Sequence, residues 1–136
     1  MQSLQIVFLV LVAAVSAMAF FTEEQHDIAK SLAEACRGEV TGELPEDFAT
    51  KMRLGDLTLD SEASKCTIQC MFAKVGFTDE DGVANRAVLV TKLSKGNPTE
   101  KAEMFADVCE KNEGDTKCDK AFSLYKCYHK NKSIFD

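Results

Sequence analysis

The six cysteines limit the fold of this chain more than any other feature of its sequence. Cys66 and Cys70 are separated by three residues inside a segment whose pattern predicts a helix, so they lie one turn apart on the same face. The other four lie elsewhere, at Cys36, Cys109, Cys118 and Cys127. A single helical turn can therefore be fastened to two distant segments.

The N-terminus predicts a secretory signal peptide over residues 1–19. Ile6 to Val15 is an unbroken apolar run that is too short to span a bilayer, and Ala17-Met18-Ala19 is a small-residue cleavage pattern. Residues 20–136 then form one secreted, extracellular domain. No later stretch is apolar enough to span a bilayer, so no stable membrane insertion is expected.

In a secreted chain, an even number of cysteines predicts a disulfide framework. A zinc site is disfavoured because the only histidines are His26 and His129 and no Cys-x-x-Cys pair occurs. A catalytic thiol would more naturally leave an odd cysteine. We therefore expect three disulfides, no metal and no cofactor.

Helix geometry removes some of the possible cysteine pairings. Cys118 and Cys127 lie on one predicted helix, roughly 13 Å apart along its axis at 1.5 Å per residue, which exceeds disulfide reach. Cys66 and Cys70 project in parallel from one helix, which is poor geometry for a bridge. About ten of the fifteen or so pairings remain open.

Start and stop signals predict three helices in the first half of the mature chain. A capping box at Thr22-Glu23-Glu24-Gln25 opens the first, which Gly38 closes. Pro45 takes the first position of a short second helix that ends at Gly55. Asp60 can cap the central helix, which runs to Gly76.

The second half predicts three more helices. One covers about Ala84 to Lys95, and the next has Asn97 as its cap and Pro98 at its first position. Asp115 can cap the last, and His129 to Asp136 forms a tail. No segment alternates apolar and polar residues for long enough to predict a strand. The expected fold class is all-α, with about six helices.

Charge and motifs exclude several functions. The formal net charge is −6, and lysine and arginine are scattered, so no nucleic-acid partner is expected. The chain has no Gly-x-Ser-x-Gly nucleophile context and no phospholipase-like His-Asp pair beside paired cysteines. It is not expected to be an enzyme.

The spacing Cys36-x29-Cys66-x3-Cys70-x38-Cys109-x8-Cys118-x8-Cys127 resembles the six-cysteine signature of insect odorant-binding proteins, the pheromone- and general-odorant-binding family. The resemblance covers essentially the whole mature chain. It implies three interlaced bridges, Cys36–Cys70, Cys66–Cys118 and Cys109–Cys127. It also implies a compact bundle of about six helices around an apolar cavity.

The resemblance further implies which residues line that cavity, while ordinary core packing is the alternative for each. The expected wall residues are Met52, Ile68, Phe72, Val88, Leu89, Ala106, Leu124 and Tyr128, with Phe135 added if the tail folds back. The Tyr128 hydroxyl is one candidate partner for a ligand head group. Arg53 or Lys92 could meet a carboxylate at the cavity mouth.

The expected function is therefore that of a secreted carrier for odorants, pheromones or long-chain fatty acids, alcohols or aldehydes. The implied partners are a small hydrophobic ligand and a chemosensory receptor, with the protein a monomer or weak homodimer. The alternative is a secreted interaction factor on the same scaffold that binds a protein or a biogenic amine.

Overall fold

A computed structural model describes the backbone of residues 23–136 and the side chains from Asp27 onward. The predicted signal peptide, residues 1–19, and Thr22 of the predicted capping box lie outside the described residues. The elements are α2 (Glu23–Arg37), α3 (Phe48–Arg53), α4 (Glu62–Val75), α5 (Arg86–Leu93), α6 (Thr99–Cys109), α7 (Lys117–Asn131) and the 3₁₀ helix η1 (Lys132–Phe135). One isolated bridge, Thr78 to Ala84, is the only β pairing among residues 23–136. The all-α prediction is confirmed.

Two predicted helix caps are wrong by one residue. The Oγ of Ser61, not Asp60, accepts the backbone N–H of Ser64 at 3.1 Å and caps α4. Thr116, not Asp115, accepts the N–H of Asp119 at 3.1 Å and caps α7. Serine, threonine and aspartate are all good caps, so adjacent candidates cannot be ranked from residue type alone.

Asn97 was predicted to cap α6, and the structure shows a different role. Its Nδ2 donates to the carbonyl of Leu93 at 3.0 Å and so satisfies the last turn of α5, while α6 begins after Pro98 without a side-chain cap. Short connections let one polar side chain serve either neighbouring helix. α5 is also shorter than predicted, because Asn85 accepts from Val88 N–H and the helix begins at Arg86.

The second helix also begins later than predicted. Asp47 has a φ of 56°, so the chain turns there and α3 starts at Phe48 rather than at Pro45. Phe48 and Met52 are buried, as expected for two residues on one helix face.

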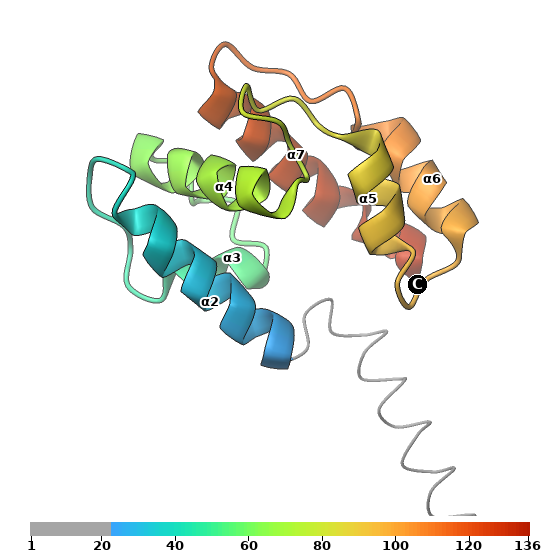
Figure 1. Cartoon of the computed structure of the whole chain (residues 1–136), viewed down its shortest axis with the longest axis horizontal. Helices are drawn as coiled ribbons and strands as arrows, with labels where there is room; N and C mark the ends of the chain where they lie inside the picture. The colour runs from blue at the N-terminus through green and yellow to red at the C-terminus, as the bar shows by residue number, and fades with distance from the viewer. Residues whose placement is uncertain (1–22) are drawn as a thin grey trace, which may run out of the picture.

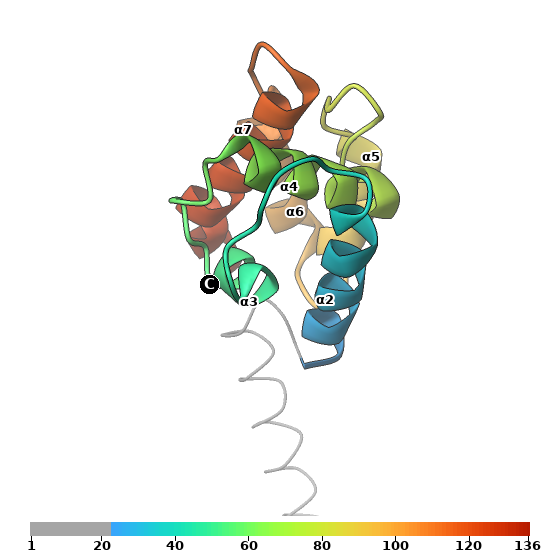
Figure 2. The same ribbon diagram turned by 90° about the vertical axis from the view of Figure 1, so that its left-hand side faces the viewer.

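The helices form two halves that share α7. α4 packs on α7 and α2, and α2 also packs on α3, while α5 packs on α6. Figure 1 shows α2, α3 and α4 on one side and α5 and α6 on the other, with α7 passing behind from the first side to the second. The turned view in Figure 2 places α3 at the end of the bundle between α7 and α2.

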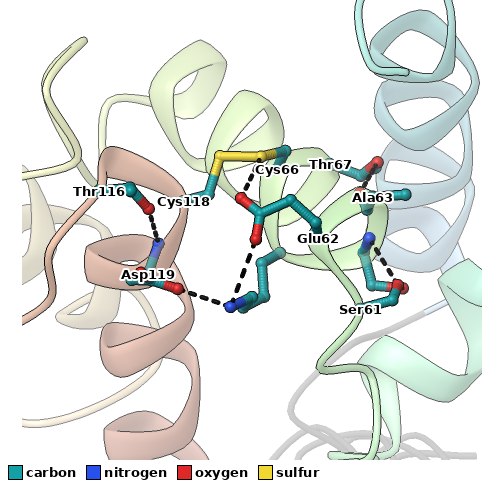
Figure 3. Close-up of a disulfide and its surroundings, with 10 residues drawn as sticks. Ser61, Glu62, Ala63, Cys66, Thr67, Thr116, Cys118 and Asp119 are labelled. Carbon is teal, nitrogen blue, oxygen red and sulfur yellow. Dashed lines mark hydrogen bonds and ion pairs between the residues drawn. A yellow bond between two sulfur atoms is a disulfide. The ribbon is translucent and has the colours of Figure 1, made fainter. Parts of the chain in front are cut away.

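The disulfide pairing implied by the resemblance is confirmed. Cys36–Cys70 joins α2 to α4, Cys66–Cys118 joins α4 to α7, and Cys109–Cys127 joins α6 to α7. An ion pair lies beside the second bridge, where Lys65 Nζ meets Asp119 at 2.6 Å (Figure 3). The central helix is thus tied to both α2 and α7.

The C-terminal tail returns to the second half of the molecule. Phe135 lies 5.7 Å from Phe105 between ring centroids, and Lys101 Nζ donates to the carbonyl of Asp136. Ile134 and Phe135 are half-buried there. The tail therefore packs on α6.

Candidate functional site

The apolar interior consists of two clusters. The first cluster lies among α2, α3, α4 and the start of α7, and contains Ala33, Cys36, Phe48, Met52, Leu59, Ile68, Met71, Ala121, Phe122 and Tyr125. The second cluster lies among α5, α6 and the end of α7, and contains Leu89, Leu93, Ala102, Phe105, Cys109 and Leu124. Phe72 of α4 packs against both clusters.

The structure distributes the expected wall residues over both clusters. Those in or against the first are Met52, Ile68 and Phe72, and those in or against the second are Phe72, Leu89, Leu124, Tyr128 and Phe135. Ala106 is fully buried, and Val88 is half-buried close to the Gly76 turn rather than in a cluster. Ligand contact by these residues stays a prediction. We take the junction of the two clusters at Phe72 as the candidate site.

Two phenylalanines in or against the second cluster are missing from the predicted wall. Phe77 makes an edge contact with Phe72 at 5.7 Å between centroids, and Phe105 is buried between Tyr128 and Phe135. Phe77 follows the glycine that ends α4, so helical spacing gives no signal for it. Phe105 does lie on the apolar face of its predicted helix, and this position could have identified it as a wall residue.

A continuous row of rings along α7 connects the clusters. Starting in the first cluster, successive centroids lie 5.9, 4.7, 4.8 and 5.6 Å apart, in the order Phe122, Tyr125, His129, Tyr128 and Phe105. These distances are typical of aromatic pairs that stabilise beyond their buried area. The row therefore links the first cluster to the second along α7.

The row is also anchored to the turn that follows α3. The Tyr125 hydroxyl donates towards the carbonyls of Met52 and Asp56, at 2.9 and 3.3 Å. A Cβ on Gly55 would lie 2.7 Å from His129 Nδ1, so the turn and the imidazole are in close contact. Burial raises the pKa of both the Tyr125 and the Tyr128 hydroxyls, which therefore stay neutral.

His129 should make the protein sensitive to acid. Burial, with a smaller contribution from Lys132, lowers the pKa of His129 from 6.5 to about 4. Its folded form is neutral while the unfolded chain protonates near 6.5, so stability is complete above pH 6.5 and is lost as the pH falls towards 4. We expect a loss of about 2 kcal/mol in the free energy of unfolding over that range.

Urea unfolding at pH 7 and pH 4.5 measures this loss. The His129→Gln variant should lose less stability than the wild type between the two pH values. Equal losses in the two proteins would contradict the assignment to His129.

Two open depressions lie away from the junction. One of about 500 Å³ is polar and lies over the start of α7, with lining residues that include Asp60, Lys65, Glu113, Asp119 and Phe122. The other, of about 400 Å³, is more apolar and lies on α2, lined by Asp27, Ile28, Ser31 and Leu32. None of the nine expected wall residues lines either depression.

No helix between residues 23 and 136 has the length and apolar character to cross a membrane.

Comparison with known proteins gives consistent matches. The PBP/GOBP family matches residues 18–131. General odorant-binding protein 56a of Drosophila melanogaster is 34% identical over 119 residues, which are 88% of this chain and 84% of that protein. Odorant-binding protein 10 of Aedes aegypti is 32% identical over 91 residues, 66% of this chain and 64% of that protein.

One solved structure is also similar. It is the fatty acid binding protein OBP56a from the oral disk of the blowfly Phormia regina, which is 34% identical. The likeness covers 83% of this chain and 96% of that one, with a TM-score of 0.66. The fold and the sequence family therefore agree.

Proposed function

The chain belongs to the PBP/GOBP family, and on that premise we propose that it carries small hydrophobic ligands at the junction of its two apolar clusters. The observation that supports this most is the position of Phe72, which packs against both clusters. Helices from both halves of the molecule contribute apolar side chains there. An apolar ligand gains from leaving water for such a lining.

The disulfides explain how a site can exist between the clusters. The halves are joined through α7, while Cys36–Cys70 and Cys66–Cys118 lie within the first half and Cys109–Cys127 lies within the second. Each half therefore keeps its own crosslinked packing when a guest separates the side chains at the junction. Covalent links offset part of the stability that a cavity costs.

The ligand class that we propose is long-chain fatty acids, alcohols or aldehydes. Its support is the similarity to the blowfly protein, which is a fatty acid binding protein. The relatives are named for binding, which favours a carrier over an enzyme. Secretion is proposed from the predicted signal peptide, and a chemosensory receptor as partner and a monomer or weak homodimer remain predictions.

Displacement of a fluorescent apolar probe from the oxidised mature protein tests the carrier function. We expect saturable micromolar uptake, with C14–C18 ligands displacing the probe better than short aromatic volatiles. The Phe72→Ala variant should bind the C16 alcohol about 10-fold more weakly, because the ligand loses a ring that both clusters support.

Met104→Ala is the matched control, because Met104 lies on α6 but is half exposed to solvent. Its affinity should equal that of the wild type. Wild-type affinity in Phe72→Ala would place the ligand elsewhere. No probe uptake by wild-type protein with intact disulfides would contradict the carrier function and favour the alternative, an interaction factor that binds a protein or a biogenic amine.

A further inference from the structure

The three arginines of the chain lie in very different surroundings. Arg37 is exposed and solvated, while Arg86 forms ion pairs with Asp107 and Glu110, each at 2.8 Å. Arg53, the last residue of α3, is half-buried, and its Nε is buried without a hydrogen-bond partner. Arg53 also has no carboxylate within ion-pair distance in the described part of the chain, although the protein has 22 acidic residues and 16 basic ones.

An unpaired guanidinium in this position is unfavourable for the folded protein alone. Burying a charged hydrogen-bond donor without a partner costs free energy, because the donor loses its hydrogen bonds to water and gains none in return. The acid nearest to it in sequence, Asp56, accepts the backbone N–H and the hydroxyl of Thr58 at its Oδ1, at 2.9 and 2.5 Å, and forms no ion pair with Arg53. Thr58 also lowers the pKa of Asp56 and so keeps it in the ionised, accepting form.

The position of Arg53 connects it to the candidate site. The preceding residue, Met52, lies in the first cluster and is an expected wall residue. The carbonyl of Met52 accepts from Tyr125, and the turn two residues after Arg53 touches His129. Arg53 thus lies at the α3 end of the aromatic row, which leads to Tyr128 and the second cluster.

We propose that Arg53 binds the carboxylate of an anionic long-chain ligand whose hydrocarbon chain lies at the junction of the two clusters. The proposal rests on the carrier function above and specifies its head-group preference. Nε and one Nη of arginine form a planar pair of donors that matches the two oxygens of a carboxylate. A hydroxyl or an aldehyde offers no charge and one oxygen, so it gains much less from the same contact.

Lys92, the other cation considered for this role, has a different environment. It is exposed, and its Nζ lies 5.8 Å from the centroid of Phe77. A solvated ammonium of this kind gives little discrimination between an acid and an alcohol. Lys92→Gln is therefore the matched control for Arg53→Gln, because it removes one positive charge from the same protein.

The test compares hexadecanoate with hexadecanol, both below their aggregation concentrations, at pH 8 where the acid is ionised. The readout is the ratio of the two dissociation constants in the oxidised protein. In the wild type and in Lys92→Gln, hexadecanoate should bind about 10-fold or more tightly than hexadecanol. In Arg53→Gln the preference should disappear, through a loss of about 10- to 100-fold in acid affinity with alcohol affinity unchanged within about 3-fold.

Three outcomes are informative. An unchanged preference in Arg53→Gln, or an equal loss for acid and alcohol, overturns the assignment while leaving the carrier function intact. Binding of neither ligand by the wild type overturns the carrier function itself and the assignment with it. If Arg53→Gln does not fold, Arg53→Lys serves instead, and a preference that stays as large as in the wild type overturns the role of the guanidinium fork.

Discussion

Replacement of both Cys66 and Cys118 by alanine is expected to lower the free energy of unfolding by about 4 kcal/mol. The bridge joins residues 52 apart in sequence, and a loop of that length gives an entropic stabilisation of about this size. The loss is a large part of the roughly 5–15 kcal/mol that holds an ordinary domain folded. Urea unfolding of the double variant, with the other two bridges oxidised, measures it.

The Cys109–Cys127 bridge provides the comparison. Its residues are 18 apart, so the same double replacement there should cost about 3 kcal/mol. A loss for the Cys66–Cys118 pair that is no larger than about 1 kcal/mol would show that the packing of α4 on α7 holds the fold without the crosslink.

Replacement of Gly82 by alanine should cost about 3 kcal/mol or more. Gly82 has a φ of 83°, which an L-residue adopts at a cost of about 1–2 kcal/mol. An added Cβ would also meet the backbone carbonyl oxygen of Lys117, at the start of α7. The loop or the helix must then move, which disturbs the bonds from Asn112 Nδ2 to the carbonyls of Gly82 and Lys120.

Gly96→Ala is a control that separates the two causes. Gly96 has a φ of 86°, and an added Cβ would meet no atom within 4 Å. It therefore carries the backbone cost alone, and should lose only about 1–2 kcal/mol. Equal losses in thermal or urea unfolding of the two variants would contradict the close approach of the loop to Lys117.

Much of the secondary structure was predictable because its signals are local. The predicted central helix ends at Gly76, which is in the left-handed region with a φ of 83°, and the first predicted helix ends at Arg37 beside Gly38. The predicted caps of α4 and α7 were wrong by one residue because two adjacent residues could each serve as the cap, as Asp60 and Ser61 could for α4. Asn97 was misassigned because its side chain is within reach of two helices.

The candidate site was only partly predictable. Apolar spacing on each helix identified residues that are buried, such as Ile68 and Leu89, but spacing cannot distinguish a ligand wall from ordinary core. Phe77 was missed because it lies outside a helix. The half-buried, unpaired state of Arg53 has no sequence signal. It depends on where the acidic side chains lie in the folded protein, and none of those that the structure describes comes within ion-pair distance of Arg53.

The sequence by itself therefore determined that this protein is an all-α, disulfide-crosslinked chain with the cysteine spacing of its family. Caps, glycine stops and helical periodicity depend on neighbours within a few residues, so they can be read along the chain. Only the tertiary structure decided that the core divides into two clusters meeting at Phe72, and that a half-buried His129 lies against Gly55. These features arise from contacts between segments far apart in sequence, whose relative positions depend on the packing of all the helices together.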